Sequence, residues 1–168
     1  MVTVEEYRSG GIFRYMKQID IAVKLLKFPL IKNTIRRKLV EKLKKHRGDF
    51  VLAPRDNFEG LINSAKTVAV GPRMCYHLYK EDISYAVFLD ELAEALIQIG
   101  SAREVSKADA IIVMKEGQES GRLHLISKVS GKPLELCNQS LETCSLWKLE
   151  RAGFKIFGNP ADNQNRRN

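Results

Sequence analysis

The sequence predicts a protein of the α+β class, in which a helical, basic N-terminal arm precedes a unit that combines helices with a small sheet. Two observations predict this class. Several segments repeat apolar residues at the three- and four-residue spacing of amphipathic helices. Between them lie short β-branched or alternating runs that are bounded by glycine or proline, which is typical of strands.

Charge and composition divide the chain into three parts. The 168 residues carry a net charge of +8, and residues 1–50 hold 13 of the 28 basic side chains but only 5 of the 20 acidic ones. We therefore expect a basic helical arm at residues 1–49, an α+β domain at residues 50–158 and a disordered polar tail at residues 159–168. A solvated helix face is the first explanation of these charges, and as a binding surface the basic arm favours an acidic protein, a membrane surface or a phosphate backbone.

The arm is expected to hold two amphipathic helices after a loose, polar start at residues 1–11. Apolar residues at helical spacing predict the first helix at residues 12–28, where Pro29 interrupts it. The pattern resumes over residues 30–48 and ends in a basic turn followed by Gly48, a common helix C-terminal signal.

The α+β domain is expected to mix short strands with helices. Strands are predicted at residues 50–54 and 67–71, the second leading into the loop that contains Cys75. A hairpin with a Ser-Gly-Lys turn is predicted at residues 122–137. The predicted helices are 56–66 capped by Asp56, 84–100, 107–120 capped by Ser106, and 141–151 capped by Ser140.

The order helix, turn, helix and hairpin from Ser84 to Cys137 resembles a winged helix-turn-helix unit. This architecture often binds DNA through its second helix. Here the expected second helix carries two lysines against three acidic residues, whereas a helix in the major groove needs positive charge toward the phosphates. We keep the winged-helix-like shape and do not expect nucleic acid as the main partner.

Four side chains are candidate metal ligands: Cys75, His77, Cys137 and Cys144. Three thiolates and an imidazole complete a tetrahedral zinc site, and three thiolates can hold an iron–sulfur cluster. On one continuous helix the two downstream cysteines would lie about 10 Å apart along the axis, too far for a single metal ion. If both are ligands, the chain between them must fold back.

Two other interpretations of these cysteines stay open. Cysteines are often buried as small apolar residues, and this chain has no C-x-x-C pair. A Cys75–His77 nucleophile pair lacks an identifiable orienting group, so no catalytic residue is assigned and the sequence does not decide whether the protein is an enzyme.

An odd cysteine count without a secretory signal predicts a cytoplasmic protein, with peripheral membrane binding through the basic helices as an additional expectation.

Five segments of the chain resemble a family of iron–sulfur proteins that is found mainly in archaea and anaerobic bacteria. The family shows an "FPL" helix start, a C-x-C-R loop after an apolar strand, a "VSKEEA" helix, "GLVH", and a C-N-C-C-x-C-C-C-L-W ending, often before a ferredoxin domain. The matching segments, spread over about 120 residues, are "FPLI", "VAVGPRMCYH", "AREVSKADA", "GRLHLI" and "LCNQSLETCSLW".

The resemblance carries over only in part. Cys75 matches the second cysteine of the family's loop, and Arg73 stands where the first would be. Cys137 matches the opening cysteine of the dense motif and Cys144 one near its end, while residues 139–143 replace the others. The trailing ferredoxin domain has no counterpart in this sequence.

The resemblance implies an iron–sulfur protein, with a 4Fe-4S cluster bound by Cys75, Cys137 and Cys144 and with His77 as a candidate fourth ligand. Its expected role is electron transfer as a redox accessory to a protein partner or a larger complex. Zinc is the alternative metal. The alternative functions are a non-catalytic interaction module or complex subunit, with structural zinc or no metal, and a winged-helix nucleic-acid-binding protein.

Overall fold

A computed structural model of the protein describes residues 2–26, 37–38, 41, 49–52, 57–73, 85–152 and 157–158. Over these ranges the protein is α+β, as predicted, with helices packed against a sheet. Several predicted features lie outside the described residues: most of the helix at 30–48, the Asp56 cap, the loop with Cys75 and His77, and the tail. The predicted division into arm, domain and tail stays a prediction.

The centre of the described structure is a seven-stranded sheet with the order β4-β2-β3-β6-β5-β1-β7. The neighbouring strands are antiparallel, except for the parallel pair β1 and β7. The strands are β1 (Phe50–Leu52), β2 (Val68–Pro72), β3 (Tyr85–Leu89), β4 (Arg103–Glu104), β5 (Leu123–Val129), β6 (Lys132–Gln139) and β7 (Phe157–Gly158). Strand β6 lies in the middle of the sheet, and its residues 134–139 are all buried.

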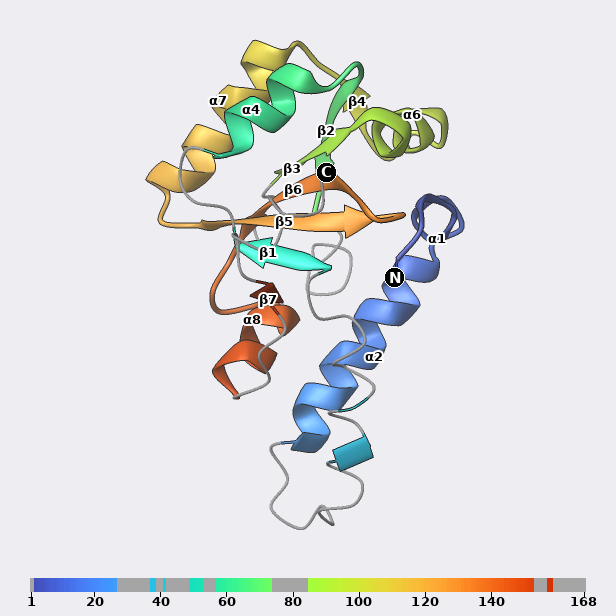
Figure 1. Ribbon diagram of the computed structural model, residues 1–168, viewed down its shortest axis with the longest axis vertical. Coiled ribbons are helices and arrows are strands. Elements are labelled where there is room, and N and C mark those ends of the chain that lie inside the picture. The colour runs from blue at the N-terminus through green and yellow to red at the C-terminus, as the bar shows by residue number, and fades with distance from the viewer. Residues whose placement is uncertain are drawn as a thin grey trace, which may run out of the picture.

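Helices lie on both sides of this sheet (Figure 1). The described helices are α1 (Val4–Arg8), α2 (Gly11–Leu26), α4 (Asn57–Ser64), α6 (Asp90–Gln98), α7 (Lys107–Glu119) and α8 (Ser145–Arg151). Helices α4 and α7 pack against each other over one face, whereas α1, α2 and α8 lie on the other, with α2 extending away from the sheet. Helix α6 packs against α1 and against β2 and β3.

The predicted hairpin is confirmed, but its surroundings differ from those of a projecting wing. Ser130 and Gly131 form its turn with φ values of 51° and 81°, the positive values that a two-residue type I′ turn requires. Both hairpin strands have further partners, because β3 pairs with β6 and β1 pairs with β5. The hairpin therefore forms the interior of a sheet that is larger than the sequence predicts.

The helix predicted at residues 84–100 is wrong in its first part, which forms strand β3. Aromatic and β-branched side chains such as Val87 and Phe88 suit a strand that is buried between two neighbours, here β2 and β6. The chain then turns into α6 at Asp90, a non-glycine residue with φ of 49°. The helix at 107–120 is confirmed as α7, and the Oγ of Ser106 caps it by accepting a hydrogen bond from the backbone N–H of Asp109.

The start of the chain, predicted to be loose, is folded against the sheet. Thr3 and Glu6 form a capping box at the beginning of α1, each side chain accepting a hydrogen bond from the other residue's backbone N–H. Val2 forms a β-bridge with Val129 of β5. Helix α2 adds one apolar face to the core, formed by Ile12, Met16, Ile19 and Val23. The described part of the expected arm thus shares its core with the sheet.

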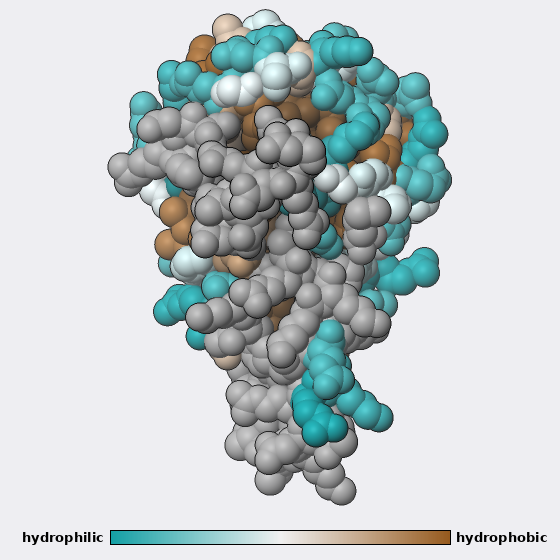
Figure 2. All heavy atoms as spheres, viewed as in Figure 1, coloured by the Kyte–Doolittle hydropathy of each residue, from teal (hydrophilic) through white to brown (hydrophobic). Residues whose placement is uncertain are grey.

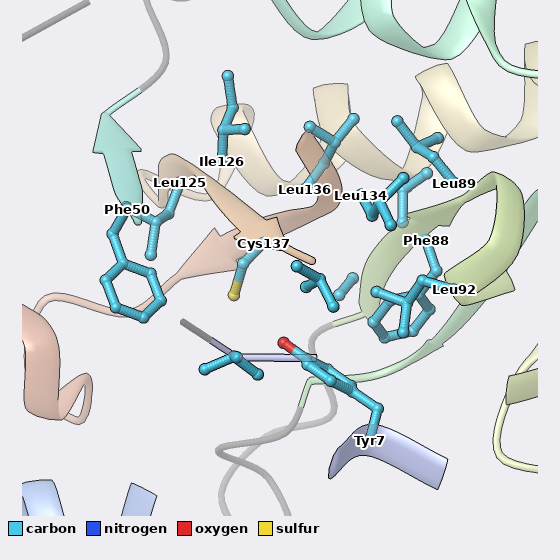
Figure 3. Packing of buried hydrophobic residues seen from close by; sticks show 14 of the residues in the cluster. Tyr7, Phe50, Phe88, Leu89, Leu92, Leu125, Ile126, Leu134, Leu136 and Cys137 are labelled. Atoms are coloured by element: carbon cyan, nitrogen blue, oxygen red, sulfur yellow. The ribbon is translucent and has the colours of Figure 1, made fainter. Parts of the chain in front are cut away.

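Apolar side chains fill the layers on both sides of the sheet. In Figure 3, Tyr7 of α1 lies below the strands with Phe50 and Cys137, while Leu136 and Ile126 lie toward the helices above. The face shown in Figure 2 is mostly hydrophilic over the described helices. Among the described segments, no helix combines the length and apolar composition that crossing a bilayer requires.

Candidate functional site: a cavity lined by two cysteines

A cavity of about 40 Å³ lies between the sheet and the N-terminal helices. Its sheet side is built by alternate residues of β6, namely Glu135, Cys137 and Gln139. Successive side chains of a strand point to opposite faces, so these three share one face. Leu125 and Ser127 of β5 lie opposite Cys137 and Glu135 in the strand register and also line the cavity.

The opposite side of the cavity is formed by segments that are distant in sequence. Tyr7 comes from α1 and Met16 from α2. Arg73 comes from the residue directly after β2, and Cys144 from the end of the connection between β6 and α8. Cys137 and Cys144, which would be too far apart for one metal ion on a continuous helix, therefore line the same cavity.

The position of Cys144 corrects the predicted last helix. Helix α8 begins at Ser145 rather than Leu141, and Cys144, not Ser140, is its N-cap residue. Residues 141–143 form turns, and the backbone N–H of Cys144 donates to the carbonyl oxygen of Ser140 over 3.1 Å. This turn folds the chain back, so that the side-chain amide of Gln139 donates a hydrogen bond to the Sγ of Cys144.

The other two predicted ligands, Cys75 and His77, lie outside the described residues. Arg73, which stands two positions before Cys75, is described and lines the cavity. In the described part of the chain, no group of three or more His, Cys, Asp or Glu side chains is placed to hold a metal ion.

Burial controls the protonation of the thiol in the sheet. Cys137 is 8% exposed and Cys144 is 2% exposed. Burial raises the pKa of Cys137 far above the ordinary thiol range, and the nearby Glu135 raises it further, while Arg73 acts in the opposite direction. Without a bound cation Cys137 is therefore a neutral thiol, and a metal that binds it must displace the proton.

Arg73 is the most unusual residue of the cavity, because an almost fully buried guanidinium normally forms ion pairs or several hydrogen bonds. It is 2% exposed, and neither its Nε nor its Nη1 group has a hydrogen-bond partner among the described residues. Glu135, the acid beside it, instead accepts a hydrogen bond of 2.6 Å from the hydroxyl of Tyr7 and is also bonded to Ser127. The Oε1 atom of Gln139 is likewise buried without a hydrogen bond from the described residues.

The sequence alone does not identify Glu135 and Gln139 as polar residues of a buried cavity. Glu135 and Gln139 occupy positions in β6 that a strand could turn to solvent, and only the central place of β6 in the sheet buries them. The one available signal is their spacing from Cys137, since residues 135, 137 and 139 of a strand share a face.

Among the described residues the cavity offers two thiols, fewer than the three or four protein ligands that a zinc site or an iron–sulfur cluster takes. Thiolates are soft ligands that bind zinc and iron–sulfur clusters. The amide of Gln139 donates to one sulfur, and Arg73 supplies a positive charge beside the thiols. A volume of about 40 Å³ suits one metal ion or a few light atoms. A cubane cluster is larger, and neighbouring side chains would have to move to admit it.

The structure gives no support to a groove-binding role of α7. Its two lysines are both engaged with α4: Lys115 Nζ lies 2.9 Å from Glu59 Oε1, and Lys107 Nζ donates to the carbonyl oxygen of Asn63 over 2.8 Å. Nucleic-acid binding is an alternative expectation from the sequence, and it stays a prediction.

Comparisons with protein-family models, with curated proteins and with solved structures found no match to this chain. The resemblance to the iron–sulfur family therefore stays an expectation from the sequence motifs.

Proposed function

We propose that this protein is a redox accessory protein whose metal centre is bound by Cys75, Cys137 and Cys144, with His77 as the candidate fourth ligand. An iron–sulfur cluster of the 4Fe-4S type is the first candidate for this centre and zinc is the alternative. The observation that carries the proposal is the cavity that Cys137 and Cys144 share. Arg73, which precedes Cys75 by two residues in the sequence, lines the same cavity.

Each described residue has a definable task in this proposal. Cys137 and Cys144 bind the metal as thiolates after losing their protons to solvent. Gln139 donates its amide hydrogen to Cys144 and so orients that sulfur. The apolar side chains of Ile12 and Met16 limit the access of water. A cluster bound there would supply one-electron transfer.

Docking to a partner is the second part of the proposal. Helix α2 exposes Arg14 and Lys17 together with two large apolar side chains, Ile21 and Leu25, which are 48% and 45% exposed. A surface that combines basic and apolar residues suits an acidic protein partner or the anionic surface of a membrane. We therefore propose that the protein is cytoplasmic and that α2 binds it to such a surface.

Anaerobic purification followed by metal analysis tests the metal centre. We expect several irons per chain and a broad absorption band near 400 nm, or one zinc if the alternative holds. Replacing Cys75, Cys137 or Cys144 singly by alanine should remove the metal while circular dichroism shows a folded protein. A metal-free protein that stays metal-free after reconstitution with iron and sulfide, or with zinc, would contradict the proposal.

An interaction module without metal is the second candidate, and the burial of the thiols favours it. Both cysteines belong to the apolar core, and an uncharged thiol packs there as a small apolar side chain. In that case the three alanine variants would lose only a little stability, and partner binding would depend on α2. Replacing Ile21 and Leu25 by serine should then abolish partner binding, with no change in metal content.

A further inference from the structure

We infer that the cavity between the sheet and the N-terminal helices binds one small monovalent oxyanion of the size of bicarbonate, and that the guanidinium of Arg73 binds its charge. This inference goes beyond the proposed function, because it needs neither a metal nor any residue outside the described lining of the cavity. It concerns the metal-free protein, and its experiment is separate from the metal analysis.

The first step is the state of the guanidinium. Arg73 lines the cavity and is 2% exposed, and its Nε and Nη1 groups have no hydrogen-bond partner in the part of the chain that the structure describes. An arginine side chain keeps its charge in proteins, and a buried charge is costly unless it is paired and hydrogen-bonded. The fold therefore places a permanent cation with available donors at the wall of a cavity, which is an arrangement suited to an anion.

The second step is the charge of the other lining residues. Lys128 is a second cation, and Glu135 is the acid among the described lining residues. The Oε2 atom of Glu135 accepts a hydrogen bond from the hydroxyl of Tyr7, and its carboxyl group does not bond to the Nε or Nη1 group of Arg73. Burial raises the pKa of Glu135, which favours a neutral carboxyl group beside an anion. The two cations thus outweigh the acid in either protonation state.

The third step is an acceptor that selects among anions. The Nε2 group of Gln139 donates to the Sγ of Cys144, while its Oε1 atom is buried without a hydrogen bond from the described residues. This oxygen needs a hydrogen atom from its neighbour in the cavity. Bicarbonate meets both requirements, because its charged oxygens accept hydrogen bonds from Arg73 and its hydroxyl group donates one to Gln139. Formate has a similar size and the same charge but no hydroxyl group.

The volume of the cavity limits the size of the anion. About 40 Å³ is roughly three times the smallest volume that holds a water molecule, so the occupant has only a few heavy atoms. Nucleotides and sugar phosphates are far too large. Ile12, Met16 and Leu146 add apolar surface to the lining. Low polarity around a bound anion would strengthen its attraction to the guanidinium.

Calorimetric titration of the metal-free full chain with sodium bicarbonate and with sodium formate tests the inference. Sodium gluconate, which is too large for the cavity, keeps the ionic strength constant. Arg73→Met removes the charge but keeps an apolar side chain of similar length, and Gln139→Met removes the acceptor. Glu135→Gln removes the acid of the lining, and Arg103→Met on the exposed strand β4 is the control. Urea unfolding shows whether each variant is folded.

We expect one bicarbonate per chain and weaker binding of formate. Arg73→Met should weaken the binding of both anions by between about 10-fold and 100-fold, the range expected for a hydrogen bond to a charged group. Gln139→Met should weaken bicarbonate binding by about 3-fold to 10-fold and leave formate binding unchanged. Glu135→Gln should bind bicarbonate at least as tightly as the wild-type protein, and Arg103→Met should bind it equally tightly.

A metal-free wild-type protein that binds neither anion would overturn the inference, as expected if the cavity holds only water. Equal bicarbonate affinity of a folded Arg73→Met variant would overturn it too. Where Arg73→Met does not fold, Glu135→Gln carries the test, since weaker binding by this variant would contradict a site for anions. Equal affinity for bicarbonate and formate would contradict the role of Gln139. A protein that binds bicarbonate but no metal contradicts the proposed function alone.

Discussion

The side-chain amide of Asn138, on strand β6, occupies the space where a Cβ atom at Gly117 of helix α7 would lie. Asn138 Nδ2 donates hydrogen bonds to the carbonyl oxygen of Val113 over 3.0 Å and to that of Tyr85 over 3.3 Å. The amide thereby joins α7 to two strands of the sheet. Because Gly117 has no side chain, the helix can approach the sheet closely enough for these bonds.

Replacing Gly117 by alanine should destabilise the protein by about 2–4 kcal/mol, because the new methyl group collides with a buried amide that holds three elements together. Gly60→Ala in α4 is the matched control, since no described atom lies within 4 Å of the place that its new methyl group would take. That change should stabilise the protein by up to about 1 kcal/mol through helix propensity. Urea unfolding measures both, and equal effects at the two sites would contradict the close approach.

Glu135→Gln should stabilise the protein increasingly as the pH rises above 4.5. Burial raises the pKa of Glu135 in the folded state above its value in the unfolded chain. At pH values between these two pKa values, the carboxyl group is ionised in the unfolded chain and protonated in the folded protein, so that unfolding releases a proton. The stability of the wild-type protein therefore falls as the pH rises between these two pKa values. Glutamine cannot ionise, so the Glu135→Gln variant does not show this loss of stability. Urea unfolding from pH 4 to pH 8 measures the difference, with Glu116→Gln on the exposed side of α7 as control. A constant difference at all pH values would contradict the raised pKa.

The hydrogen bond between Tyr7 and Glu135 should contribute about 1–3 kcal/mol, since both partners are buried and Tyr7→Phe leaves the carboxyl group without this donor. A double-mutant cycle with Glu135→Gln isolates the coupling between the two side chains. We expect Tyr7→Phe to be less destabilising in the glutamine background, because the amide is cheaper to leave unpaired than a carboxyl group. Additive effects of the two changes would show that the bond does not couple α1 to β6.

Acid should destabilise the protein through His124. Its ring packs edge-on against Phe58 with centroids 4.8 Å apart, and its Nε2 lies 3.0 Å from the carbonyl oxygen of Met114. Burial lowers the pKa of His124, so as the pH falls below 6.5 the unfolded chain gains a proton that the folded chain resists, and stability decreases. His124→Gln should flatten the dependence of stability on pH between pH 7 and pH 5, which urea unfolding measures. An equally steep loss in the variant would assign the effect to another group.

Local signals predicted the elements that carry their own patterns. The alternation and the Ser-Gly turn predicted the hairpin, and the Ser106 cap together with helical spacing predicted α7. The same kind of reasoning failed at β3, because its apolar residues fit a helix face and a buried strand equally well. Only the pairing of β3 with β2 and β6 distinguishes the two.

The candidate site shows the same division. The sequence named Cys137 and Cys144 because thiols are conspicuous chemical groups, and it required the chain between them to fold back. The structure brings both to one cavity by means of the turn at residues 141–143. It also adds Arg73, Glu135 and Gln139, whose importance depends on burial that no local pattern reports.

The sequence by itself determined the α+β class, the basic N-terminal segment, the hairpin and the identity of the thiols, because these depend on composition and on residues that are near one another in the chain. The tertiary structure alone decided that β6 is central, that α1 covers it and that Arg73 is buried beside two cysteines. Burial and charge pairing arise between segments as distant as Tyr7 and Glu135, 128 positions apart, and their energies exist only once those segments have packed together.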